Sequence, residues 1–568
     1  MFELAPTSAQ DALDWSWDRF QPFLDDLMER ELNNENIDQW MEDWSKISKL
    51  IQEIYARLYL ATTQSTSDKE IEKKYFNFLE NIYPKAGSAG QELKQKLLES
   101  GLVPENFEVQ IRDMKTESAL FREENLSILT EEFKLCSKYD NISGKQTVKW
   151  EGEEVTLSQL LPVYQDEDRS KREKVWNLSM DRRLQDRGEF NKLWGEFLDL
   201  RENLAKNADH PNYRSYRFQQ MLRLDYSVEE CKEFDQAILD IAVPAAKQIY
   251  KKRQAHLGLD SLRPWDLNVD VFGREPLRPY EDVTKLISGT SRIFHKVDPV
   301  LGEYFDTMHA EDLFDLENRK NKAPGAYCID FPLAKRPFIF QNAVGLHDDV
   351  QTLLHESGHA FHVFESIHLP YSQQLQYSAE IAEVASTTME LLTSPYLTKD
   401  QGGFYTPAEA ARARIEHLES FILFWPYMAI VDLFQHWVYE NHEDAKNSDN
   451  CDLKWGELWD KYMVGIDYNG FEDVKVTGWH RKLHIFQEPF YYIDYGLAQI
   501  GAIQIWENSL TDQLDAIVKY RYGLSLGATR PLPELFKATG GELAFDAETV
   551  SKATKLLMNT IEELEKVK

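Results

Sequence analysis

Cysteine is scarce in this sequence, with four residues among 568, and no two of them form a CxxC pair. Four thiols spread so widely do not make the disulfide framework of a secreted protein, so a reducing compartment is expected. The N-terminal segment MFELAPTSAQDALDW lacks the basic and apolar regions of a secretory signal. The longest apolar run, Phe421 to Phe434, is too short to span a bilayer and predicts part of a buried helix. Together these absences predict a cytoplasmic protein.

Basic residues are also fewer than acidic ones: the chain has 64 Lys and Arg against 96 Asp and Glu, which gives a formal net charge of −32. Proteins bind nucleic acid or an anionic membrane surface through an excess of Lys and Arg, so neither partner is expected. The hydrophobic fraction of 42% and the aromatic fraction of 12% exclude a disordered chain. The acidic charge therefore predicts a well-solvated globular protein.

No internal repeat, low-complexity tract or sustained heptad is visible, yet apolar residues recur at helical spacing through most of the chain. The predicted fold class is therefore mainly α, with a few short strands. A β-hairpin is expected at 146–156, where apolar and polar residues alternate around Glu151-Gly152. The stretch 265–272 is also strand-like. We divide the chain into an N-terminal helical lobe, 1–200, and a second helical region, 201–568, which interleave in space.

The segment 323–344 departs from the helical pattern, because it contains three prolines and β-prone residues. Two short strands are predicted there, at Tyr327–Phe331 and Pro337–Gln341. Proline is tolerated mainly at the edge of a sheet, so one of the two is expected to be an edge strand.

The strongest chemical signal is the pentapeptide HESGH at 355–359, within a segment that predicts an amphipathic helix. His355 and His359 are four residues apart, so both imidazoles lie on one face of the helix and can bind one metal ion. Glu356 follows the first of them, and from there its carboxylate can reach a water held by the metal and act as general base. The motif predicts a hydrolytic zinc site.

Such a site needs a third protein ligand. The metzincin pattern is excluded, because His362 and Glu365 stand where that class has glycine and histidine. A carboxylate from a second helix is the alternative, and Glu380, Glu383 and Glu390 recur at helical spacing downstream. Any of these could supply the third ligand or accept a hydrogen bond from an imidazole. Small residues between them indicate close helix packing.

A second cluster of polar aromatic residues follows at 484–496, HIFQEPFYYIDYG. Histidine and tyrosine can donate hydrogen bonds to the oxyanion of a tetrahedral intermediate, as peptide hydrolysis requires. Tyr492 and Tyr495 are three residues apart, so one helix face could direct both toward a cleft, with His484 nearby.

The segments HESGHAFH, EIAEVAS and HIFQEPFYYIDYGLA resemble the thimet oligopeptidase/oligoendopeptidase F family of zinc metallopeptidases, and the bacterial oligoendopeptidase F branch most closely. The strong part of the resemblance runs from about Gly325 to Gln499. Shorter segments, PFIFQN at 337–342 and GATRPLPELFKATG at 527–540, are similar as well. The resemblance implies a helical, two-lobed body with a deep central channel that admits short peptides.

The resemblance also implies roles for individual residues. One zinc ion per chain would be bound by His355, His359 and Glu383, and Glu356 would be the general base. Glu380 would contact these ligands without binding the zinc itself.

On the substrate side, the resemblance assigns transition-state stabilisation to His484, Tyr492 and Tyr495. It implies that the segment Gly325, Ala326 and Tyr327 contacts the substrate backbone. The thimet branch carries a further tyrosine in a glycine-rich stretch after the histidine, where this chain has FQEP. Tyr491 is left without a role.

These features together predict a zinc-dependent endopeptidase that cleaves internal bonds of short, unstructured peptides. Two alternatives stay open. A helical metallocarboxypeptidase of the Taq type also uses HExGHA, although its DxRxT pattern is missing here. A catalytically silent peptide-binding protein could retain the zinc site, although such a protein has no need of Glu356.

Overall fold

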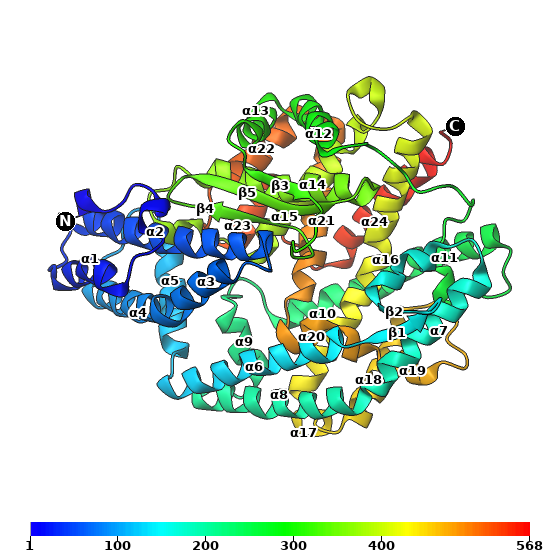
Figure 1. Cartoon of the computed structure of the whole chain (residues 1–568), viewed down its shortest axis with the longest axis horizontal. Coiled ribbons are helices and arrows are strands. Elements are labelled where there is room, and N and C mark those ends of the chain that lie inside the picture. The colour runs from blue at the N-terminus through cyan, green and yellow to red at the C-terminus, as the bar shows by residue number, and fades with distance from the viewer. Residues whose placement is uncertain (1, 568) are drawn as a thin grey trace.

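The structure is a computed structural model that describes residues 2–567, and it is mainly helical, as predicted (Figure 1). The sheet with the helices around it occupies the upper part of Figure 1, and α6, α8 and α18 occupy the lower part. The long helix α16, Pro407–Glu440, runs through both parts. A single apolar core that contains residues from Leu120 to Leu564 connects them.

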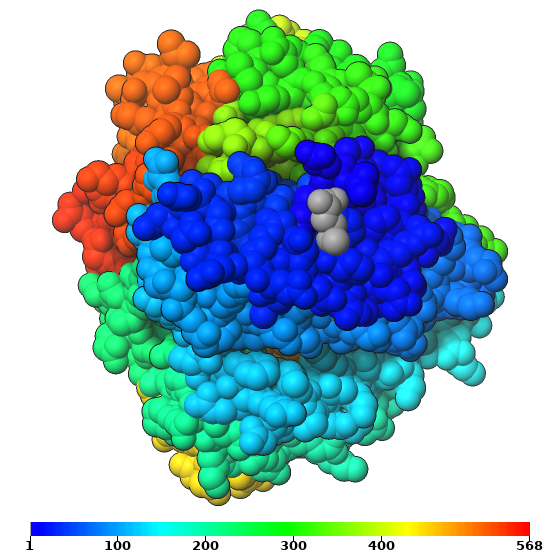
Figure 2. All heavy atoms as spheres, turned by 90° about the vertical axis from the view of Figure 1, so that its left-hand side faces the viewer, coloured from blue at the N-terminus to red at the C-terminus, as the bar shows by residue number. Residues whose placement is uncertain are grey.

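The N-terminal helices form a separate body with its own apolar core. This core holds buried residues between Phe2 and Met114, together with Tyr371. Figure 2 shows these helices lying across one side of the molecule, between its upper and lower parts. They are α1 Trp17–Glu29, α2 Ile37–Gln64, α3 Lys69–Asn81, α4 Tyr83–Ser100 and α5 Glu108–Leu120. The division of the chain at residue 200 stays a prediction.

The next part of the chain supplies the helices of the lower part and the predicted hairpin. β1 Thr147–Trp150 pairs antiparallel with β2 Glu153–Thr156, and Glu151 and Gly152 form the turn with positive φ angles. The helices of this part of the chain are α6 Glu123–Gly144, α7 Arg169–Gln185, α8 Arg187–Asn207, α9 Tyr213–Gln220, α10 Val228–Ala237 and α11 Val243–Leu257.

The strand-like stretch 265–272 is not a strand, so this prediction was wrong. Its start forms a short 3-10 helix, Pro264–Asp266. The buried carboxylate of Asp266 accepts hydrogen bonds from Arg169 and Arg172 and from the backbone N–H of Arg263. These bonds fix a loop, in which Trp265 packs against Trp176 and Val474 while Phe272 is exposed.

Three strands form the sheet beside the candidate site. β5, Arg336–Ala343, lies between β3, Phe314–Glu317, which is parallel to it, and β4, Tyr327–Phe331, which is antiparallel. β4 and β5 occupy the predicted positions, and β4 is the edge strand. β3 was not predicted, because four residues with two carboxylates give little strand pattern.

The HESGH helix is α14, His347–Ser366, and it packs on the sheet. Its start is fixed by Asp349, whose carboxylate accepts hydrogen bonds from the backbone N–H groups of Val344, Gly345 and Leu346. A carboxylate in the first turn satisfies free N–H groups and favours the positive end of the helix dipole. The capping residue therefore sets where the motif begins.

The remaining helices complete the body around α14. They are α12 Val283–Val297, α13 Pro299–Ala310, α15 Ala379–Thr393, α17 His442–Ala445, α18 Ser448–Tyr462, α19 Glu472–Val476, α20 Leu483–Gln487, α21 Tyr492–Thr511, α22 Gln513–Ser525, α23 Leu532–Thr539 and α24 Ala547–Leu564. By length and composition α16 could cross a membrane, but 72% of its most apolar window is buried inside the protein. It is a core helix, as the run Phe421 to Phe434 predicted.

Candidate metal centre and active site

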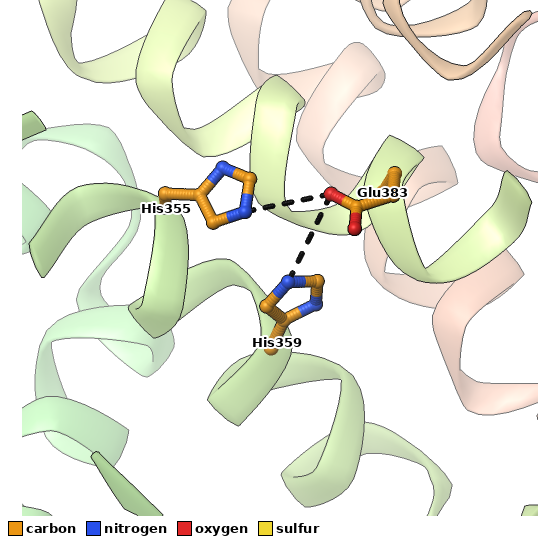
Figure 3. A group of neighbouring side chains, drawn as sticks. All are labelled: His355, His359 and Glu383. Atoms are coloured by element: carbon orange, nitrogen blue, oxygen red, sulfur yellow. Dashed lines mark ion pairs between the residues drawn. The ribbon is translucent and has the colours of Figure 1, made fainter. Parts of the chain in front are cut away.

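Helices α14 and α15 bring three potential metal ligands together (Figure 3). The Nε2 atom of His355 lies 3.4 Å from Oε2 of Glu383, and Nε2 of His359 lies 4.0 Å from the same oxygen. All three donor atoms lie within 4.8 Å of one another. Two imidazoles and one carboxylate are the donor set of a hydrolytic zinc site with one open position. The residues therefore fit zinc.

The close approach of the two helices depends on Gly358. A Cβ atom at this position would lie 2.5 Å from the carbonyl oxygen of Ala385 and 2.5 Å from the Cα atom of Ser386. Only glycine allows the backbones to come this near without displacing α15. This contact confirms the close packing that the small residues of EIAEVAS indicated, and it lets Glu383 reach both imidazoles.

Glu390 forms a hydrogen bond with the imidazole of His355, through the ring nitrogen that does not face Glu383. Its Oε1 atom lies 2.6 Å from Nδ1 of His355, and its Oε2 atom lies 2.6 Å from Nε2 of His417 on α16. Burial opposes the charged carboxylate, but the hydrogen bonds with the two histidines outweigh it and keep the pKa of Glu390 at about 2. An acceptor at Nδ1 fixes the tautomer that leaves Nε2 free to bind a metal.

Glu356 is 7% exposed and directly follows His355 on α14, which packs against strand β4. Burial raises the pKa of Glu356 to about 7, with the charge of His355 opposing the shift and Glu383 adding to it. A carboxyl group with a pKa near neutrality can both take and release a proton at physiological pH.

Helices α20 and α21 place the aromatic cluster, and its members face different ways. The rings of Tyr491 and Tyr495 have centres 5.3 Å apart, and both side chains are half-buried. Burial raises the phenol pKa of both, and the carboxylate of Glu383 raises each further. Tyr492 is mostly buried, and the ammonium of Lys482 lies 3.5 Å from its ring centre. The geometry therefore favours Tyr491 over Tyr492 as the partner of Tyr495, and the role predicted for Tyr492 stays a prediction.

His484 lies beside this cluster, with its ring centre 4.8 Å from that of Tyr492 and 6.2 Å from that of Tyr495. Burial, with a contribution from the charge of Lys482, lowers the pKa of His484 to about 4. The imidazole is therefore neutral at physiological pH and carries one N–H that can donate a hydrogen bond.

Glu380 differs from its predicted position beside the ligands. Its Oε1 atom accepts a hydrogen bond of 2.7 Å from the hydroxyl of Tyr226, and Glu390 takes the place next to the imidazole instead. Glu380 belongs to a buried network in which Arg223 donates a hydrogen bond of 2.6 Å to Asp494. The spacing of the carboxylates placed Glu380 and Glu390 on one helix face, but it could not tell which of them meets His355.

The same network fixes the turn before the tyrosines. Phe490 has a positive φ of 67°, which residues other than glycine rarely adopt. Its carbonyl accepts a hydrogen bond from Arg223, and its N–H donates one to Gln435. These two bonds stabilise the turn that carries Tyr491 into α21.

The segment Gly325, Ala326 and Tyr327 leads into edge strand β4. Gly325 has a φ of 99°, and its carbonyl accepts a hydrogen bond of 2.9 Å from the side chain of Asn342. The ring of Tyr327 stacks on Phe340, and its hydroxyl meets Thr63 of α2, so this side chain points toward the N-terminal helices. Contact of the segment with a substrate backbone stays a prediction.

Sequence reasoning missed several residues of this site. His417 lies 27 residues from Glu390, and no local spacing connects the two. Arg223 belongs to no motif, and only its burial beside Asp494 reveals it. Tyr491 lay inside the aromatic cluster, and its direction could be told only from the structure.

Known proteins resemble this chain in both sequence and structure. A sequence model of peptidase family M3 matches residues 163–554. The group B oligopeptidase PepB of Streptococcus agalactiae serotype III (strain NEM316) is 26% identical over 262 residues, or 45% of this chain and 41% of PepB. The chromosomal oligoendopeptidase F of Lactococcus lactis subsp. cremoris is 27% identical over 337 residues, or 57% of this chain and 52% of the relative. The chain thus matches about half the length of these relatives.

The structural likeness extends further along the chain. The structure of PZ peptidase A with an inhibitor superimposes with a TM-score of 0.85 at 26% identity, and the match covers 99% of both chains. Since the family model covers well over half of the sequence, the resemblance noted from the motifs is confirmed. This chain belongs to peptidase family M3.

Proposed function

We propose that this chain is a zinc-dependent endopeptidase that hydrolyses internal bonds of short, unstructured peptides in the cytoplasm. The observation that carries the proposal is the convergence of His355, His359 and Glu383 beside the buried carboxyl group of Glu356. Membership of peptidase family M3 and the oligopeptidase names of the relatives support it.

The proposed cofactor is a single zinc ion held by His355, His359 and Glu383. When bound, zinc supplies a Lewis acid that makes water more acidic and polarises a peptide carbonyl. Glu390 orients His355 by accepting a hydrogen bond at Nδ1, so that Nε2 is directed at the ion.

The proton transfers are assigned to Glu356. Its carboxylate removes a proton from the attacking water and then delivers it to the nitrogen of the leaving amine. Burial raises the pKa of this carboxyl group and so makes it a stronger base for both steps, because the group must be deprotonated before the attack and protonated after it.

Charge that develops on the carbonyl oxygen needs hydrogen-bond donors. The neutral His484 and the phenol of Tyr495 are the donors that the proposal uses. Tyr491 is proposed as the third donor in place of the sequence-predicted Tyr492, whose ring packs against that of His484. Edge strand β4 offers unpaired backbone groups, which an extended peptide could pair with as an added strand. Gly325, Ala326 and Tyr327 would contact the substrate there.

The test is a series of unstructured peptides of increasing length, incubated with the protein and analysed by mass. Internal cuts in the short peptides that disappear with a chelator and return with zinc are expected. Stepwise loss of single C-terminal residues would show a carboxypeptidase. Binding without cleavage, in protein that holds zinc, would show a silent peptide-binding protein.

A further inference from the structure

A second cavity lies apart from the candidate metal centre, among α6, α7 and the 3-10 helix Gly478–Arg481. It encloses about 290 Å³, many times the space of one water molecule. Its wall combines aromatic and apolar side chains with two guanidinium groups. The residues that matter here are Tyr139, Leu184, Phe190, Arg183, Arg481 and Asp140.

The two arginines at this cavity make no ion pair with any residue in the range 2–567. Arg481 donates a hydrogen bond of 3.2 Å to the sulfur of Met180, which is a weak acceptor. Arg183 donates none to residues 2–567, and its Nε atom is fully buried. Each guanidinium carries five N–H donors, so nearly all of this donor capacity is unused.

The protein has a net charge of −32, so carboxylates are plentiful, yet neither guanidinium pairs with one among residues 2–567. The neighbouring Arg182 shows the ordinary case, because it pairs with Asp186 at 2.8 Å. Asp140 lines the cavity, but one of its oxygens already accepts a hydrogen bond from Gln487. One carboxylate beside two guanidinium groups leaves the cavity positively charged.

Without a ligand, these two unpaired charges lower the stability of the folded protein. Burial lowers the pKa of Arg183, and the charge of Arg481 lowers it further. Both arginines are half-buried. A partly buried charge without a partner destabilises a folded protein, so an anion that contacts both groups would offset the desolvation and the repulsion. Planar guanidinium groups bind carboxylate and phosphate through paired hydrogen bonds.

We propose that this cavity binds a small organic anion, in which a carboxylate or phosphate group is attached to an apolar, ring-sized body. Arg183 and Arg481 bind the anionic group. Tyr139, Phe190 and Leu184 pack against the body. The volume is close to the lower end of the range for small-molecule sites.

Along the chain, the cavity lies next to the candidate active site. Arg481 lies three residues before His484, and Leu483 also lines the cavity. The binding proposal itself does not depend on peptidase activity.

The test is calorimetric titration of the zinc-loaded protein with four probes: inorganic phosphate, phenyl phosphate, phenylacetate and the neutral phenylacetamide. Phenylacetate and phenyl phosphate are expected to bind at least about tenfold more tightly than phenylacetamide, because charge-assisted hydrogen bonds are lost in the amide. The ratio between phenyl phosphate and phenylacetate identifies the preferred anionic group. Inorganic phosphate shows how much the anion contributes without the apolar body.

Arg183→Gln and Arg481→Gln are each expected to weaken anion binding about tenfold or more. Arg182→Gln is the matched control and should leave it unchanged, because Arg182 pairs with Asp186 on the same helix. A probe that binds to the metal centre instead of the cavity would bind equally well to all three variants. The variants therefore distinguish the two places of binding. Anion binding that is equal to amide binding, or unchanged in both cavity variants, would overturn the proposal.

A stability measurement gives an independent test. Arg183→Met removes the unpaired charge, so the ligand-free variant is expected to unfold at a higher temperature than the wild-type protein. If the variant unfolds at a lower temperature, Arg183 has a structural role and the proposal fails.

Discussion

The hydrogen bond between Glu390 and His355 makes a quantitative prediction for Glu390→Gln. The substitution keeps the shape of the side chain but removes the negative charge that faces Nδ1 of His355 and Nε2 of His417, each at 2.6 Å. Loss of an outer partner of a ligating histidine typically costs 10–100-fold in metal affinity. At about 1.4 kcal/mol for each factor of ten, this is about 1.4–2.8 kcal/mol of zinc binding free energy.

Zinc affinity can be measured by competition with a chromophoric chelator in zinc-buffered solution. Glu380→Gln provides the matched control, because Glu380 is a buried carboxylate on the same helix that binds Tyr226 instead of an imidazole. Its zinc affinity is expected to stay within about twofold of the wild-type value. Equal affinity in Glu390→Gln and wild type would refute the reasoning, as would a larger loss in Glu380→Gln.

Three further predictions follow from the surroundings of the site. Arg223→Met removes the cation that pairs with Asp494 in the core, where both side chains are 1% exposed. Urea unfolding should therefore show a loss of about 3–5 kcal/mol, and a loss below about 1 kcal/mol would contradict this. Tyr491→Phe should lower kcat by about tenfold or more while Tyr492→Phe changes it little, and the opposite order would restore the sequence-based assignment. Burial lowers the pKa of His480 to about 3, so below about pH 6.5 the unfolded chain takes up a proton that the folded protein does not. The free energy of unfolding should therefore fall by up to about 1.4 kcal/mol per pH unit between about pH 6 and 4, and His480→Gln should reduce this slope; an unchanged slope would contradict the assignment.

The sequence was sufficient for those parts of the fold and site that depend on local spacing. Two histidines one helical turn apart predicted a shared face, and the structure directs both at Glu383. The strand 327–331 was predicted at its observed bounds because its residues are β-prone and its flanks contain proline.

Features that depend on contacts between distant segments could not be predicted in this way. His417 meets Glu390 only because the fold brings α16 near α15, and no pattern in the sequence encodes that approach. The prediction of a strand at 265–272 was wrong for a related reason, since ion pairs from α7 fix the position of Asp266 outside any strand. The direction of each tyrosine near 491–495 depends on the turn at Phe490, which Arg223 fixes from the loop after α9 and Gln435 fixes from α16.

The central claim is that zinc held by α14 and α15 acts together with Glu356 in peptide hydrolysis. The most direct test is to measure zinc content and peptide turnover in the same preparation of Glu356→Gln. The account predicts one zinc ion per chain, as in the wild-type protein, with turnover abolished. Substantial turnover in the zinc-loaded variant would contradict the account.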